Sequence, residues 1–150
     1  MNWEAIFGAV NVLAMLSWVS LILLPRWPAL LSSLLYLVVG GLCLLYSSLI
    51  ISFMFGWVDA GPSDGQGGFG SITEVQALFS SPGGLTIGWI HYLAFDLFVG
   101  IWIARDADAK NFSRFLQFPV LVLTFLAGPL GLLLWLIIRE GRARAQGRWT

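Results

Sequence analysis

Two ionisable side chains, His91 and Asp96, lie in the middle of a long apolar stretch of this 150-residue sequence. If that stretch crosses a membrane, the carboxyl group costs about 3 kcal/mol to insert, and such residues usually mark a function. Burial without a cation favours the neutral form of Asp96, which can donate a proton or a strong hydrogen bond. His91 can act as a base or an acid near neutral pH. We therefore take both as candidate catalytic residues for acid–base chemistry.

The alternative interpretation is structural. Either side chain can instead hydrogen-bond to polar residues on other helices and fix their packing. The candidate partners are Asn11, Ser47, Ser48, Gln117 and Thr124. On an α-helix, His91 and Asp96 lie about 140° apart around the axis and about 7.5 Å apart along it, so we expect no direct contact between them.

Large aromatic side chains accompany these two residues on the same stretch. They are Trp89, Tyr92, Phe95, Phe98 and Trp102. Such side chains can line a pocket for a long conjugated ligand, so they are candidate substrate-binding residues, although ordinary packing explains them equally well.

The composition indicates where these residues lie. Apolar residues make up 58% of the chain and charged residues 11%, against roughly half and a quarter in soluble domains. A soluble domain of this size has too little interior for that much apolar surface, so the composition predicts an integral membrane protein. With zero net charge and no basic face, we expect no nucleic-acid partner. With one cysteine the chain cannot form an internal disulfide, and with one histidine it cannot hold a bis-histidine haem. We expect no metal and no cofactor.

Four charge-free runs are long enough for a spanning helix, which needs about 20 apolar residues. They predict helices at about 4–24, 29–56, 83–104 and 115–138 in a single membrane domain over residues 1–150. The pattern from Ser71 to Glu74 is a capping box, which predicts a short helix over residues 72–80. The predicted fold is all-α: a polytopic four-transmembrane-helix bundle with a short interfacial helix in the central loop.

Four spans place the N-terminus, the central loop and the C-terminal tail on one side of the membrane. The eight Lys and Arg residues then divide four to four, so the positive-inside rule assigns no orientation. We interpret the segment from Arg105 to Lys110 as a short, solvated, charged loop.

Two segments carry a resemblance to a known family. GWIHYLAFDLFVG at residues 88–100 and LTFLAGPLG at residues 123–131 resemble the plant neoxanthin-synthase family, the ABA-deficient-four-like proteins. The resemblance implies a membrane protein needed to turn violaxanthin into neoxanthin, which opens an epoxide and creates an allene without net redox change. Asp96 fits the acid and His91 the base of that reaction. Because no transit leader precedes the first helix, we expect a bacterial-type, multi-pass member in the bacterial inner membrane.

Three functions remain open from the sequence. The first is a cofactor-free isomerase acting on a carotenoid or another apolar lipid. The second is a non-catalytic pigment-binding or assembly subunit, with His91 as an axial ligand to a tetrapyrrole metal. The third is a small transporter with Asp96 as a proton carrier. The expected partners are membrane lipid, a carotenoid or other apolar ligand, and either further copies of the chain or a larger pigment–protein complex.

Overall fold

The computed structural model describes residues 1–65 and 67–146, with the side chain of residue 146 left out. Its elements are α1 (Trp3–Leu23), α2 (Pro28–Ser32), the π-helical η1 (Ser33–Val39), α3 (Gly40–Met54), α4 (Ile72–Ser80), α5 (Pro82–Ala109), α6 (Arg114–Leu126) and α7 (Gly128–Gln146). No strand occurs in this part of the chain, so the all-α prediction is confirmed.

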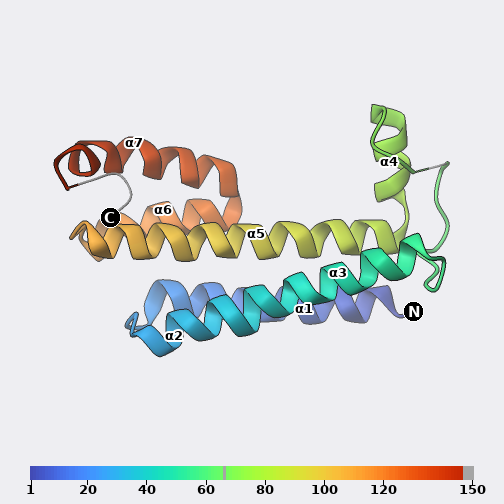
Figure 1. Cartoon of the computed structure of the whole chain (residues 1–150), viewed down its shortest axis with the longest axis horizontal. Helices are drawn as coiled ribbons and strands as arrows, with labels where there is room; N and C mark the ends of the chain where they lie inside the picture. Colours follow the sequence, from blue (N-terminus) through green and yellow to red (C-terminus); the bar gives the residue numbers. More distant parts are fainter. Residues whose placement is uncertain (66, 147–150) are drawn as a thin grey trace.

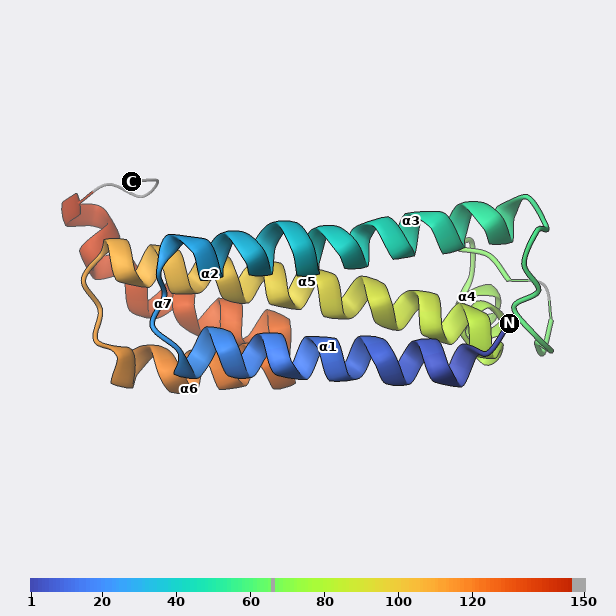
Figure 2. The ribbon, with the colours of Figure 1, turned by 90° about the horizontal axis from the view of Figure 1, so that it is seen from below.

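Three of the described helical segments are long and apolar enough to cross a membrane: α1, the continuous run α2–η1–α3, and α5. They lie side by side and alternate in direction, with α5 packed against both α1 and α3 (Figures 1 and 2). Apolar helices of about 20 residues or more are what a bilayer core requires. The chain is therefore an integral membrane protein, as its composition predicts.

The short helix α4 has the bounds that the sequence predicts, residues 72–80. The Ser71 Oγ accepts a hydrogen bond from the Glu74 backbone N–H at 3.2 Å. The Glu74 carboxylate reaches back to the backbone N–H of Gly70 at 2.8 Å, one residue before the helix cap. These bonds satisfy donors that a helix N-terminus leaves without partners. Helix α4 lies crosswise to α5, next to the N-terminal end of α5 (Figure 1).

The last apolar segment is not the single span predicted over residues 115–138. The chain leaves the helical conformation at Ala127 (φ −154°, ψ 75°), which ends α6, and α7 then runs back along α6 (Figure 1). The break lies just before Pro129, because proline cannot continue a preceding helix but fits the first turn of the next. With 13 residues, α6 is about 20 Å long, well short of the roughly 30 Å apolar core of a bilayer. The predicted count of four spanning helices is therefore not confirmed.

The helical hairpin formed by α6 and α7 brings the C-terminal part of the chain back to the end of the bundle at which α5 terminates (Figure 1). All seven Lys and Arg residues of the described chain lie at this end, which we call the basic end. They are Arg26, Arg105, Lys110, Arg114, Arg139, Arg142 and Arg144. The four-to-four division expected from the sequence is therefore not confirmed, because it required a fourth span that carries the tail to the other side.

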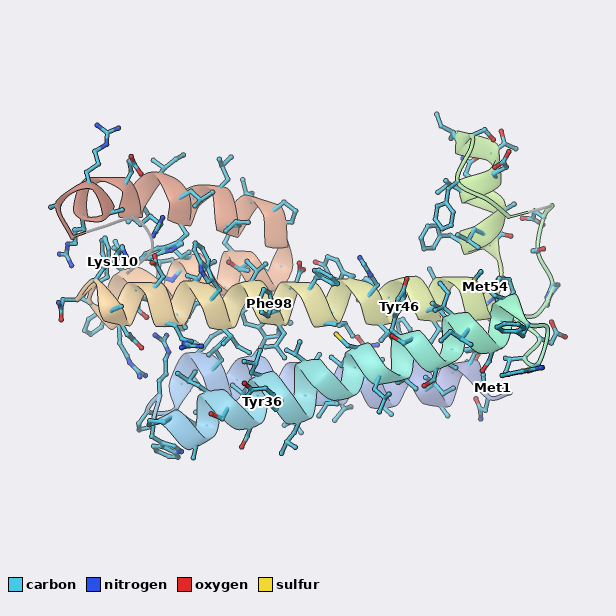
Figure 3. The ribbon with its side chains drawn as sticks, viewed as in Figure 1. Met1, Tyr36, Tyr46, Met54, Phe98 and Lys110 are labelled. Atoms are coloured by element: carbon cyan, nitrogen blue, oxygen red, sulfur yellow. The ribbon has the colours of Figure 1, made fainter. Side chains whose placement is uncertain are left out.

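The segment from Arg105 to Lys110 is also not a solvated loop, since α5 continues to Ala109 and buries part of these charges. Asp106 accepts hydrogen bonds from Arg139 Nε at 2.6 Å and from Trp135 Nε1 at 2.9 Å. Its Oδ1 lies 3.1 Å from the Nζ of Lys110, a side chain that is 1% exposed. The cluster ties the end of α5 to α7 at the basic end, and Lys110 lies there beside the hairpin (Figure 3).

A second ionic cluster joins the α1–α2 loop to α5 and α6. Asp108 lies 3.0 Å from Arg26 and accepts a hydrogen bond from Gln117 Nε2 at 3.0 Å. The Arg26 guanidinium also donates to the Gln117 side chain. Burial lowers the pKa of Arg26 from its usual value, and the neighbouring Asp108 carboxylate opposes that shift. Both carboxylates of the predicted loop are thus paired with cations from other elements.

Candidate functional site

Asp96 lies on α5 against the tip of the α6–α7 hairpin. A Cβ atom at Gly128 would lie only 2.6 Å from the Asp96 Cγ, so the close approach requires glycine. Tyr92, one turn earlier on α5, forms a side-chain hydrogen bond with the Asp96 carboxyl group. The Asp96 Oδ2 atom is buried and has no hydrogen-bond partner among the described residues.

This contact brings together the two sequence segments that carry the family resemblance, residues 88–100 and 123–131. Gly128 is the first residue of α7, and the N-terminal end of a helix carries a partial positive charge that attracts negative charge. Helices α6 and α7 also approach each other closely at the hairpin tip, because a Cβ at Gly131 would lie 2.5 Å from the Thr124 Cα. Asp96 therefore faces a tightly packed helix N-terminus instead of a cation.

His91 lies on a different side of α5, facing α3. Its ring stacks on Phe95, with centroids 4.6 Å apart, and packs against Tyr46 of α3 at 5.4 Å. The residue is exposed, and no hydrogen bond of its ring nitrogens is found in the part of the chain that the structure describes. The imidazole is therefore able to exchange a proton with a bound ligand or to coordinate one.

An apolar groove of about 430 Å³ opens beside His91. Its walls come from α3, α4, α5 and the loop before α4: Tyr46, Ile50, Phe53, Met54, Phe69, Leu78, Phe79, Gly84, Ile87, Gly88 and His91. Figure 3 shows Tyr46 and Met54 on α3, beside the half of α5 that the hairpin leaves uncovered. Pockets that bind small molecules have volumes of about 300–1,000 Å³ and mostly apolar walls. The groove thus has the size and character of a binding site for an apolar ligand.

Helix α4 closes one end of this groove. The Phe79 ring packs directly over Gly88, where a Cβ atom would lie 3.1 Å from the Phe79 Cζ. Gly84 is likewise pressed against α4, since its Cβ would lie 3.1 Å from the Leu78 backbone C. These glycines allow a close contact between α5 and the short helix α4.

Two of the predicted substrate-binding residues lie on the side of α5 that faces α1. The Trp89 Nε1 donates a hydrogen bond to the Asn11 Oδ1 at 3.0 Å. The Trp89 ring also stacks on Phe7 of α1 and on Tyr92, with centroids 5.8 and 5.0 Å apart. Because Tyr92 bonds to Asp96, this aromatic stack reaches the carboxyl group but not the groove.

The other three predicted aromatic residues are spread along α5. Phe95 is 55% exposed and contacts His91, and Phe98 is 48% exposed near the middle of the bundle (Figure 3). Trp102 lies beneath the Arg139 guanidinium, 5.5 Å from it. Within the described residues, the five aromatics therefore do not line a single pocket.

Four of the five polar residues that the sequence offers as packing partners for His91 and Asp96 form hydrogen bonds with other groups, and the fifth, Ser47, is exposed. Asn11 bonds to Trp89, Gln117 belongs to the second ionic cluster, and Ser48 and Thr124 donate to carbonyl groups of their own helices. In the described chain, no group of His, Cys, Asp and Glu side chains is arranged to hold a metal ion.

Sequence reasoning missed two residues of this region, Gly128 and Tyr46. A signal for Gly128 was present, since Gly128-Pro129 interrupts an otherwise apolar helix, but it indicated a kink as readily as a break. Nothing in the sequence pairs Tyr46 with His91, because their contact depends on how α3 packs against α5.

A family model described as ABA DEFICIENT 4-like matches residues 5–135 of the chain. The matched range includes His91, Asp96, the apolar groove and the hairpin tip. No curated protein and no solved structure matches the chain.

Proposed function

This chain belongs to the ABA DEFICIENT 4-like family, and we propose from that premise that it is a cofactor-free isomerase of a carotenoid or a similar apolar lipid. The observation that supports the proposal most strongly is the apolar groove of about 430 Å³ with His91 in its wall. A titratable ring without a hydrogen-bond partner, set in an apolar groove, is suited to proton transfer with a bound apolar molecule.

The ligand enters from the bilayer and lies across the uncovered face of α5. One end occupies the groove between α3 and α4. The rest continues past Phe95, which is 55% exposed, toward the hairpin tip. From Gly88 to Asp96 the helix rises about 12 Å. Because His91 and Asp96 lie on different sides of α5, a molecule that reaches both has to be longer than the groove and to curve around the helix.

The proposed chemistry is a rearrangement in which one proton enters and one leaves. Asp96 in its neutral form donates a proton to the oxygen of an epoxide, and a carbon–oxygen bond breaks. His91 removes a proton from carbon, and the released electron pair forms a carbon–carbon double bond. The product is an isomer of the substrate, and the pair is restored when His91 loses its proton and Asp96 regains one. Double-bond migration in a related lipid uses the same two roles.

The test is a pigment and lipid profile, by chromatography with mass detection, of a host that carries a deletion, the wild type or single variants. The variants are Asp96→Asn, His91→Ala and Ile50→Phe, the last of which places a larger side chain in the groove wall. Asp64→Asn, in the exposed loop before α4, is the matched carboxylate control. We expect one isomer to disappear in the deletion and in the first three variants, at unchanged protein level, and to persist in the control. Identical profiles throughout would overturn the isomerase proposal.

A second candidate function is pigment binding without catalysis. It is favoured by the placement of His91, whose ring is flanked by Tyr46 and Phe95 and available as an axial ligand. Under this proposal the purified protein carries a chromophore in fixed proportion. We expect His91→Ala to remove the visible absorbance while Asp96→Asn keeps it, with no isomer lost from the host. A colourless wild-type protein argues against this function.

A further inference from the structure

A second pocket, of about 420 Å³, lies at the basic end, far from the groove beside α4. It is formed where α2 and η1 approach the last turns of α5. Its polar lining comes from Arg26, Arg105 and Ser32, and its apolar lining from Leu31, Leu35 and Tyr36. Charged groups and apolar groups therefore meet in one small site.

Arg105 supplies this pocket with a positive charge that no carboxylate of the described residues neutralises. Its side chain is exposed, and no ion pair or hydrogen bond of its guanidinium is found among the described residues. The nearby carboxylates are already paired, Asp106 with Arg139 and Lys110, and Asp108 with Arg26. A guanidinium with five N–H donors and no carboxylate partner is suited to bind a phosphate group.

The apolar side of the pocket extends along a spanning helix. Leu31 and Leu35 lie one turn apart, and Tyr36 beside them is 74% exposed. This part of the run includes the π-helical turn η1, a feature that often accompanies functional sites. A molecule bound through an anionic group at Arg105 can therefore lay hydrocarbon chains on this surface.

The position of the pocket relative to the membrane agrees with such a molecule. Every described Lys and Arg residue lies at the basic end, and the positive-inside rule places that end on the cytoplasmic side. The cytoplasmic leaflet carries anionic lipids, and basic pockets between spanning helices on that side bind their headgroups.

We propose that this pocket binds the phosphate headgroup of an anionic phospholipid, with Arg105 as the main phosphate-binding residue and the acyl chains on Leu31, Leu35 and Tyr36. Arg26 adds N–H groups, while its own charge is balanced by Asp108. The site is separate from the proposed catalytic groove and does not depend on the proposed function.

The test measures lipid binding to the purified protein in an uncharged detergent by native mass spectrometry. Phosphatidylglycerol is titrated against phosphatidylcholine, and inorganic phosphate is tested in a separate arm. One basic residue near an anionic headgroup contributes about 1 kcal/mol, so we expect Arg105→Gln to weaken phosphatidylglycerol binding about fivefold. Arg105→Lys retains part of the affinity. Arg144→Gln, at an exposed arginine that pairs with Glu140 at the same end, leaves it unchanged.

A second variant tests the pocket while keeping Arg105. Ser32 is exposed in the pocket wall, so Ser32→Glu places a negative charge there and abolishes the preference for phosphatidylglycerol. Equal binding of the two lipids by the wild type would overturn the proposal. It is also overturned if Arg105→Gln and Arg144→Gln have the same affinity for phosphatidylglycerol. Inorganic phosphate that binds as tightly as the lipid would overturn it as well, because that result indicates a site for a free anion.

Discussion

Asp106 is the residue whose replacement we expect to destabilise the protein most. Its carboxylate is the shared partner of Lys110 and Arg139, whose side chains are 1% and 7% exposed. It also accepts the hydrogen bond of the Trp135 indole. Asp106→Asn preserves the shape of the side chain and one acceptor oxygen. It removes the negative charge that lies between the buried side chains of Lys110 and Arg139.

The expected loss follows from this burial. Removing one partner of a buried ion pair costs about 3–5 kcal/mol, because the buried cations lose the carboxylate that they share. In a chain of this size about 1 kcal/mol shifts the melting temperature by roughly 2–4 °C, so Asp106→Asn lowers it by roughly 6–20 °C. Adding Lys110→Met removes one of the two buried cations that shared this carboxylate, and the double variant therefore melts above Asp106→Asn alone.

The assay is thermal unfolding in detergent, followed by circular dichroism. The matched control is Arg144→Gln, which breaks an ion pair whose arginine is 72% exposed. Such surface pairs contribute about 0–1 kcal/mol. The reasoning is refuted if Asp106→Asn melts at the temperature of the control, since the cluster would then be solvated as the sequence first suggested.

Two further predictions concern the hairpin. In a cysteine-free background, Ser63→Cys and Ala145→Cys react with a membrane-impermeant thiol reagent from opposite sides of the membrane, whereas labelling from the same side would indicate four spans. Gly128→Val pushes a side chain into the Asp96 carboxyl group, which a Cβ already approaches to 2.6 Å at Cγ. Such overpacking costs about 1–3 kcal/mol and lowers the melting temperature. Gly141→Ala in α7 does not lower it, because nothing lies within 4 Å of a Cβ there and alanine favours a helix more than glycine does.

Elements that depend on local sequence were predicted well. The three long helices follow from uninterrupted apolar runs, and α4 follows from the capping pattern of Ser71 and Glu74. The expectation that His91 and Asp96 do not touch also rests on local geometry, because a helix fixes the angle between two of its residues. The structure places them on different sides of α5, as that angle requires.

Features that depend on distant contacts could not be predicted in this way. Hydropathy does not distinguish one span over residues 115–138 from two shorter helices that pack against α5, because both arrangements bury the same apolar residues. The extension of α5 to Ala109 depends on Arg26 and Arg139, which reach Asp108 and Asp106 from the α1–α2 loop and from α7. No local pattern reveals that those carboxylates have partners.

The hairpin also determines how the chain must be built into a membrane. Both of its ends lie at the basic end, so residues 110–146 stay on one side of the bilayer in this arrangement. With the basic end on the cytoplasmic side, as the positive-inside rule predicts, the segment from Phe55 to Ser81 is the polar loop that has to be translocated, and its described residues include no Lys or Arg. Biogenesis therefore ends in a docking step, in which α6 and α7 join an α5 that is already in place.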